Sequence, residues 1–147
     1  MDFKAIPELV NFESFRIQDP EYIEANPHLF APDRALYLDG IVQSTLHGNA
    51  AYHEALVQPS MIAHPNPKRV AIIGGGECAT LREVLKHNTV EKVVMIEIDP
   101  GVIEVAKYAL PMWNDCSHFE GSSRYCMDDT RAEIHNDDAF AWFIDRY

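Results

Sequence analysis

The chain has 147 residues, of which 47% are hydrophobic and 24% charged, and its formal net charge is −11. Length and composition indicate a globular protein with one core, or with one small domain and part of another. No apolar run approaches the roughly 18 residues of a membrane helix, and the negative charge argues against nucleic acid, which binds through Lys and Arg. The charge is compatible with a cationic small ligand, although solubility alone is the more common reason for it.

The N-terminal sequence and the cysteines predict a cytoplasmic protein. The first residues, MDFKAIPELVNFESF, lack the basic segment followed by an apolar segment that marks a secretory signal. Three cysteines, Cys78, Cys116 and Cys126, are an odd number at spacings that match no disulfide framework, and they form no CxxC pair for zinc. We therefore expect a cytoplasmic protein without a disulfide framework and without a metal site.

Residues 1–47 are predicted to form a small, mostly β, N-terminal unit. Residues 12–18, FESFRIQ, suit a short strand, and residues 26–34, NPHLFAPDR, are predicted to be a loop because of their two prolines. In RALYLDGIVQST, residues 34–45, the pair Asp39-Gly40 separates two short apolar runs. Asp-Gly in this setting is the strongest short-range signal of a β-hairpin.

Residues 48–147 alternate between helical and strand patterns. Residues 49–63 have apolar residues near helical spacing, and Pro59 predicts a kink or a break near Gln58. After a turn, the pattern predicts strand, helix, strand and helix in succession, which is typical of a parallel sheet with crossover helices. The four segments are residues 69–73, 79–87, 92–98 and 100–110.

The last part of the chain adds a long connection, a third strand and a third helix. Residues 114–130 show no clear period and are unusually long for a connection, so this insertion is expected to be either functional or mobile. RAEIHNDD and AFAWFIDRY then predict the strand and the helix. Three such units make half of a doubly wound, Rossmann-like sheet, in which the strand at 70–73 lacks a neighbour on one side. We expect the sequence to be the front part of a longer protein.

A glycine-rich turn follows the first of these strands. Gly74, Gly76 and Ala79 fit the pattern GxGxxG/A, and Glu97 ends the next strand at the distance where this fold places an acid. Glycines let a ligand approach the backbone closely, and a carboxylate at that strand end can accept two hydrogen bonds from a ribose diol. The combination favours an adenosine-type ligand over a purely structural turn.

Glu77 directly follows the glycines, at a place where it would oppose the pyrophosphate of a dinucleotide. A sulfonium nucleoside has no phosphate and carries a positive charge, so it tolerates an acid there. The alternative is an acid at a helix N-terminus, which the helix dipole favours by a few tenths of a kcal/mol to about 1 kcal/mol.

Two further clusters are candidates, and each has a structural alternative. Tyr52 and His53 in AYHE can present a hydroxyl and an imidazole to a pocket, or can be a packed tyrosine and a surface histidine. No second histidine follows at the HExxH spacing, so this cluster is not a zinc site. Asp137 and Asp138 in NDDA end the third strand at the carboxyl edge, where ligands bind in such sheets, or else cap the following helix.

Five segments carry a family resemblance: LYLDGIVQST, AYHEALVQPSMIAHPNPKRVAIIGGGE, TLREVLKH, VEKVVMIEIDPGVIEVAKYALP and DDAF, in this order. Together they resemble the polyamine synthases, or aminopropyltransferases, and especially spermidine synthase. The resemblance is dense over residues 36–111 and loose over 131–143. It implies an N-terminal β unit, a Rossmann-like domain of the methyltransferase type, and assembly as a homodimer or homotetramer.

The family transfers an aminopropyl group from decarboxylated S-adenosylmethionine, a co-substrate, to an amine such as putrescine, and it releases methylthioadenosine. The resemblance implies this reaction here, with no prosthetic group. Synthesis of spermine or thermospermine and a non-catalytic, nucleoside-binding role are the alternatives. The family's catalytic aspartate falls beyond Tyr147, so we expect no catalytic residue in this chain and no activity from it alone.

The resemblance also implies roles for individual residues. Tyr52, His53 and Glu77 match positions that bind the polyamine and aminopropyl groups. Glu97 matches the acid that holds the ribose. The remaining nucleoside-binding positions are Gln18, Gln43, Gly74, Gly75, Gly76 and the pair Asp138-Ala139, which matches an Asp-Gly pair near the adenine.

The turn departs from the family pattern. The family reads GGGDGGTLREV where this chain reads GGGECATLREV. Glu77 is one methylene longer than aspartate and reaches further, while Cys78 and Ala79 place Cβ atoms where two glycines leave space. We expect recognition of a cation to be retained and the choice of substrate to be affected.

Overall fold

The computed structural model describes residues 20–25, 34–119, 121 and 123–146. The chain divides into two compact units, residues 1–33 and residues 34–147. In the first unit the described residues form one helix, α2 (Pro20–Ala25). The strand expected at residues 12–18 lies outside the described residues, and so does Gln18.

The predicted hairpin is confirmed. Strand β1 (Ala35–Leu38) pairs antiparallel with β2 (Ile41–Thr45). Asp39 and Gly40 join them with φ angles of 50° and 78°. Positive φ at both central positions gives the backbone twist that a two-residue turn needs, which is why Asp-Gly is so informative there.

The hairpin belongs to the second compact unit, which begins at residue 34. Two long-range hydrogen bonds tie the hairpin segment to that unit. Arg34 Nη1 donates to the Ala109 carbonyl at 3.0 Å, and Trp113 Nε1 donates to Ser44 Oγ at 2.7 Å. These partners are far apart in sequence, so no local pattern indicates them.

Helix α4 (Asn49–Ala63) runs through Pro59 without a break. Of the kink or break expected near Gln58, the break does not occur. Proline removes one backbone donor and crowds the preceding turn, which disfavours a helix interior. Val57 and Met61, on either side of Pro59, are both buried in the main core, and this packing outweighs the local cost of the proline.

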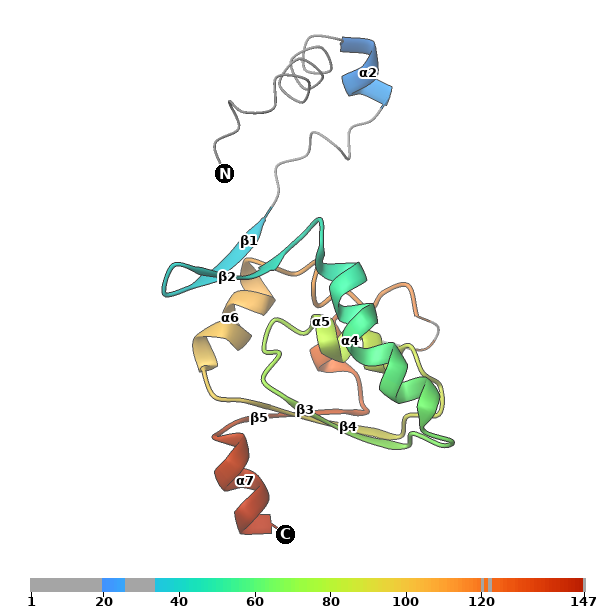
Figure 1. The fold of residues 1–147 in the computed structure, drawn as a ribbon, viewed down its shortest axis with the longest axis vertical. Helices are drawn as coiled ribbons and strands as arrows, with labels where there is room; N and C mark the ends of the chain where they lie inside the picture. Colours follow the sequence, from blue (N-terminus) through green and yellow to red (C-terminus); the bar gives the residue numbers. More distant parts are fainter. Residues whose placement is uncertain (1–19, 26–33, 120, 122, 147) are drawn as a thin grey trace. The chain divides into compact units, whose positions relative to one another are not determined.

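Three parallel strands form the central sheet, in the order β3 (Arg69–Ile73), β4 (Lys92–Glu97) and β5 (Ala132–Asn136). Within the described residues, β3 pairs on one side only, as the strand pattern predicts. Helices α4, α5 (Ala79–Leu85) and α6 (Pro100–Tyr108) cover one face of the sheet, and α7 (Ala139–Arg146) lies on the other (Figure 1). Helices on both faces make the arrangement a partial, Rossmann-like α/β fold.

The insertion at 114–130 contains a disulfide between Cys116 and Cys126, so the expectation from cysteine count and spacing is wrong. The segment folds back on itself, which brings the two cysteines together. Cys116 N–H donates to the Arg124 carbonyl at 2.9 Å, and Cys126 N–H donates to the Asn114 carbonyl at 2.8 Å. A short 3₁₀ helix, η2 (Cys126–Asp128), follows. The cysteines therefore no longer argue for a reducing compartment.

In the part of the chain that the structure describes, no helix combines the length and the apolar character of a membrane span.

Candidate functional site

The glycine loop, residues 74–78, turns the chain sharply between β3 and α5. Gly74 and Gly75 both have φ of 77°, and Cys78 has φ of 71°. A residue with a Cβ in this left-handed conformation costs roughly 1–2 kcal/mol. The turn thus retains a conformation suited to glycine at Cys78, the position at which the family pattern has glycine.

Cys78 is fully buried, and its thiol is unreactive. Burial raises the pKa of its thiol to about 12, and the charge of Glu77 adds to the effect. Its Sγ lies 3.4 Å from the Gly76 carbonyl. The thiol therefore stays protonated, and a protonated thiol is neither a nucleophile nor a metal ligand.

Gly76 and Glu97 fit together closely. Glu97 ends β4 and is 7% exposed. Its Oε2 accepts from the Gly76 N–H at 2.9 Å, and its Oε1 accepts from the Asp99 N–H at 2.9 Å. Each carboxylate oxygen keeps a further lone pair, so a fixed carboxylate can accept hydrogen bonds from two neighbouring hydroxyls.

A side chain at position 76 would collide with this carboxylate. A Cβ there would lie 2.8 Å from Glu97 Cγ, 3.0 Å from Glu97 Oε2 and 3.0 Å from Val102 Cγ1. Glycine at this position is therefore required by the packing of Glu97.

Two of the predicted candidates, Glu77 and His53, are in direct contact. His53 is buried on α4, and its Nε2 lies 3.0 Å from Glu77 Oε1. The Glu77 side chain is 15% exposed, so part of the carboxylate remains open to solvent. Tyr52 is next to them but largely open: it is 63% exposed, and its ring stands edge-on to the His53 ring at 4.9 Å.

The end of β5 lies beside Glu97. Asn136 Nδ2 donates to the Glu97 carbonyl at 2.9 Å, and the Asp137 N–H donates to the same carbonyl at 3.1 Å. Asp138 caps α7, because its Oδ1 accepts from the Phe140 and Ala141 N–H groups at 2.8 and 3.1 Å. The capping alternative for Asp138 thus describes its observed contacts, and Ala139 is the first residue of the helix.

Gln43 lies on β2, where it is exposed and donates to the Ile41 carbonyl of its own hairpin at 3.3 Å. The structure thus gives Gln43 a contact within the hairpin and none with the glycine loop. Among the predicted residues, Gly76 is in direct contact with Glu97, and His53 is in direct contact with Glu77.

A buried polar network that the sequence analysis did not identify supports this site. Arg82 Nη2 donates to Asn49 Oδ1 at 2.8 Å, and its Nε donates to Glu83 Oε1 at 3.1 Å. Asn49 Nδ2 donates to the Leu46 carbonyl at 2.6 Å. Asn49 begins the helix that carries His53. The only sequence signal for Arg82 is its place in the TLREVLKH motif.

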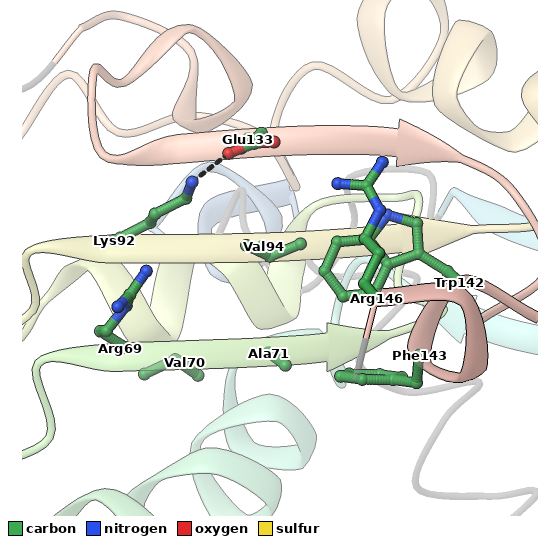
Figure 2. A pocket seen from close by; sticks show the side chains of 9 residues that line it. All are labelled: Arg69, Val70, Ala71, Lys92, Val94, Glu133, Trp142, Phe143 and Arg146. Carbon is green, nitrogen blue, oxygen red and sulfur yellow. Dashed lines mark ion pairs between the residues drawn. The ribbon is translucent and has the colours of Figure 1, made fainter. Parts of the chain in front are cut away.

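The pocket shown in Figure 2 is a different feature, with a volume of about 480 Å³. It lies between α7 and the face of the sheet, and Arg69 and Lys92, which begin β3 and β4, help to line it. Lys92 pairs there with Glu133. Hydrogen bonds from Lys92 and His135 lower the pKa of the Glu133 carboxyl. Ligands of such sheets bind beyond the carboxyl ends of the strands, so the candidate site lies at Glu77 and Glu97 and not in this pocket.

The described residues contain no group of three or more His, Cys, Asp and Glu side chains that could hold a metal ion. The arrangement instead offers a glycine turn and two carboxylates at the carboxyl edge of a parallel sheet. These features define a Rossmann-like fold with a candidate ligand site at the carboxyl edge of its sheet.

Comparisons with known proteins give the family. The spermine/spermidine synthase domain matches residues 49–147, and the chain belongs to this family. It is 51% identical over 109 residues to polyamine aminopropyltransferase 1 of Hyperthermus butylicus, covering 74% of this chain and 34% of that protein. It is 50% identical over 107 residues to polyamine aminopropyltransferase of Aeropyrum pernix, covering 73% and 31%.

Solved structures of spermidine synthases also match the chain. Spermidine synthase from Thermotoga maritima matches with a TM-score of 0.64 and 42% identity, covering 74% of this chain and 34% of that one. A spermidine synthase in complex with the transition-state analogue AdoDATO matches with a TM-score of 0.59 and 46% identity, covering 68% and 31%. The chain thus spans about a third of the length of these relatives.

Proposed function

We propose that the protein transfers an aminopropyl group from decarboxylated S-adenosylmethionine to putrescine, giving spermidine and methylthioadenosine. The observation that carries this proposal is the presence of two differently placed carboxylates at one glycine loop. Glu97 is fixed by backbone N–H groups, and Glu77 is partly open beside His53.

Glu97 is proposed to bind the ribose, because its two oxygens are held in place and each can accept another hydrogen bond. Gly74, Gly75 and Gly76 would let the nucleoside approach the backbone. Asp138 and Ala139, which follow the end of β5 next to Glu97, are proposed to contact the adenine. Gln18 and Gln43 complete the proposed nucleoside-binding set.

Glu77 is proposed to bind a cationic amine, with Tyr52 and His53 lining the same subsite. An anionic phosphate would be repelled by this carboxylate, whereas an ammonium group would be attracted. An alkylamine has a pKa near 10, like lysine, and is protonated at neutral pH. The attacking nitrogen must lose a proton before it displaces the sulfonium, so the reaction also needs a general base.

The geometry required is a displacement in which the amine nitrogen, the carbon and the sulfonium sulfur lie in line. Holding two substrates in such an arrangement is itself a large part of catalysis. On this proposal Glu77 serves in binding and positioning, and the two substrates occupy adjoining parts of one site.

The test is to incubate the full-length protein with decarboxylated S-adenosylmethionine and putrescine and to measure methylthioadenosine by chromatography. We expect methylthioadenosine and spermidine in equal amounts. No methylthioadenosine with any amine would reject the enzyme and leave a nucleoside-binding relative as the alternative.

The acceptor is a separate question, because Glu77, Cys78 and Ala79 differ from the family pattern of Asp-Gly-Gly. Offering spermidine in place of putrescine, and separating the products, distinguishes a spermine or thermospermine synthase. We also propose a homodimer or homotetramer in the cytoplasm, which light scattering of the purified protein and cell fractionation would test.

A further inference from the structure

His53 is held between two hydrogen-bond acceptors. Its Nδ1 lies 2.6 Å from the Asn49 backbone carbonyl oxygen, and its Nε2 lies 3.0 Å from Glu77 Oε1. A carbonyl oxygen only accepts, so Nδ1 carries a hydrogen. An ionised carboxylate also only accepts, so a hydrogen bond from the ring to the Glu77 carboxylate needs a second hydrogen, on Nε2. The pair therefore holds one proton more than a neutral imidazole beside a carboxylate.

The ring is fixed in this orientation. His53 is 2% exposed, and the carbonyl that receives its Nδ1–H belongs to Asn49, a buried residue anchored on both sides. Arg82 Nη2 donates to Asn49 Oδ1, and Asn49 Nδ2 donates to the Leu46 carbonyl. The ring consequently keeps Nε2 directed at Glu77.

The charged groups on the two helices around His53 are engaged elsewhere. On α5, Arg82 bonds to Glu83. Lys86, the residue that follows α5, pairs with Glu54 of α4 at 3.1 Å. Tyr52 of α4 presents its ring edge to His53.

The acids on the strand side are also accounted for. Glu97 at the end of β4 accepts from two backbone N–H groups. In the loop, the raised pKa of Cys78 keeps its thiol neutral. Glu77 is thus the charged partner that the structure places against His53.

We propose that His53 is a positioning residue for Glu77, and that it releases a proton when a primary ammonium group binds this carboxylate. This inference rests on the proposed function, in which Glu77 receives an amine. The ammonium group brings its own N–H donors and its own positive charge, and so replaces Nε2–H as the donor to Glu77. The Nε2 proton passes to solvent, the ligand stays an ammonium ion, and Glu77 stays a carboxylate, so one proton appears in solution and no other bond changes.

Proton release makes binding depend on pH in a defined direction. Over the range in which the pair carries its extra proton, each pH unit lowers the apparent Kd of an amine-bearing ligand by up to about tenfold, as proton linkage requires. The ligand amine has a pKa near 10, so it stays protonated between pH 6 and 8 and does not contribute this slope. A ligand without an amine should show no such dependence.

The experiment is titration calorimetry of the full-length protein between pH 6 and 8, in pairs of buffers with different ionisation enthalpies. Decarboxylated S-adenosylmethionine is the amine-bearing ligand, and methylthioadenosine is the matched ligand that lacks the aminopropyl group. The variant is His53→Gln, whose amide can donate to Glu77 but has no proton to release. We expect the wild type to release up to one proton when it binds decarboxylated S-adenosylmethionine and none when it binds methylthioadenosine. The variant should release no proton from position 53 with either ligand.

The outcomes separate the two proposals. Equal proton release by wild type and His53→Gln, in a protein that makes methylthioadenosine, overturns the inference and leaves the proposed function standing. Absence of binding and of product overturns both. If the variant does not fold, ¹⁵N resonances of the His53 ring in the wild type decide the matter, because the proposal requires Nε2 to lose its proton only with the amine-bearing ligand.

Discussion

Gly76 and Glu97 show how one missing side chain sets the position of another. The space that a Cβ would take at Gly76 is filled by the Glu97 carboxylate, which also accepts the Gly76 N–H. A collision of this kind with a buried side chain typically costs about 1–3 kcal/mol. The position of the proposed ribose-binding group therefore depends directly on this glycine.

Replacing Gly76 by alanine should move Glu97 and break its hydrogen bond to the loop. We expect Gly76→Ala to weaken methylthioadenosine binding by tenfold or more, as measured by calorimetry, because the carboxylate loses its fixed orientation. Gly40→Ala is the control: its positive φ makes alanine strained, but nothing lies within 4 Å of its Cβ, and it is on the hairpin. An unchanged affinity in Gly76→Ala would contradict the role of Glu97.

Asp138, the residue before helix α7, has both a structural and a proposed functional role. Asp138 Oδ1 accepts two backbone N–H groups of the first turn, which satisfies donors that the helix itself leaves free. The same residue is proposed to bind the nucleoside. A single alanine substitution would mix the two effects.

Two substitutions separate them. Asp138→Ala removes the cap and should lower the free energy of unfolding by about 1 kcal/mol, whereas Asp138→Asn keeps a capping oxygen and should leave stability nearly unchanged. Urea unfolding measures both variants. A nucleoside affinity lowered in Asp138→Asn at full stability would assign the carboxylate to the ligand, and equal stability of Asp138→Ala and wild type would refute the cap.

Elements governed by neighbouring residues could be predicted from the sequence, and those governed by distant partners could not. Asp39-Gly40 indicated the hairpin because a tight turn has strict backbone requirements, and the alternation of strand-like and helical segments indicated the three strands. Pro59 favoured a kink or a break, and the break does not occur because core packing on both sides of the proline outweighs its local cost. At the site, the glycine loop, Glu97 and the Tyr52-His53 pair had local signals, but the contact of His53 with Glu77 and the network through Arg82 depend on how α4 meets α5.

At the scale of the whole molecule, the disulfide closes a loop within the 114–130 insertion, and its two cysteines pack into the main core. Cys116 and Cys126 are fully buried in the same cluster as Leu81 of α5 and Val93 of β4. The insertion is therefore packed into the second unit through its cysteines. The crosslink acts on the stability of this whole core, which also carries the glycine loop.

Reduction of this bond should destabilise the protein without a change in sequence. The cysteines are 10 residues apart, and closing a loop of about this length restricts the unfolded chain by about 2–3 kcal/mol. We expect urea unfolding of the oxidised and the reduced wild type to differ by this amount. The matched control is the double variant Cys116→Ala, Cys126→Ala, whose stability should not respond to a reducing agent because Cys78 remains a thiol in either condition. Equal stability of the oxidised and reduced wild type would mean that packing alone holds the insertion in place.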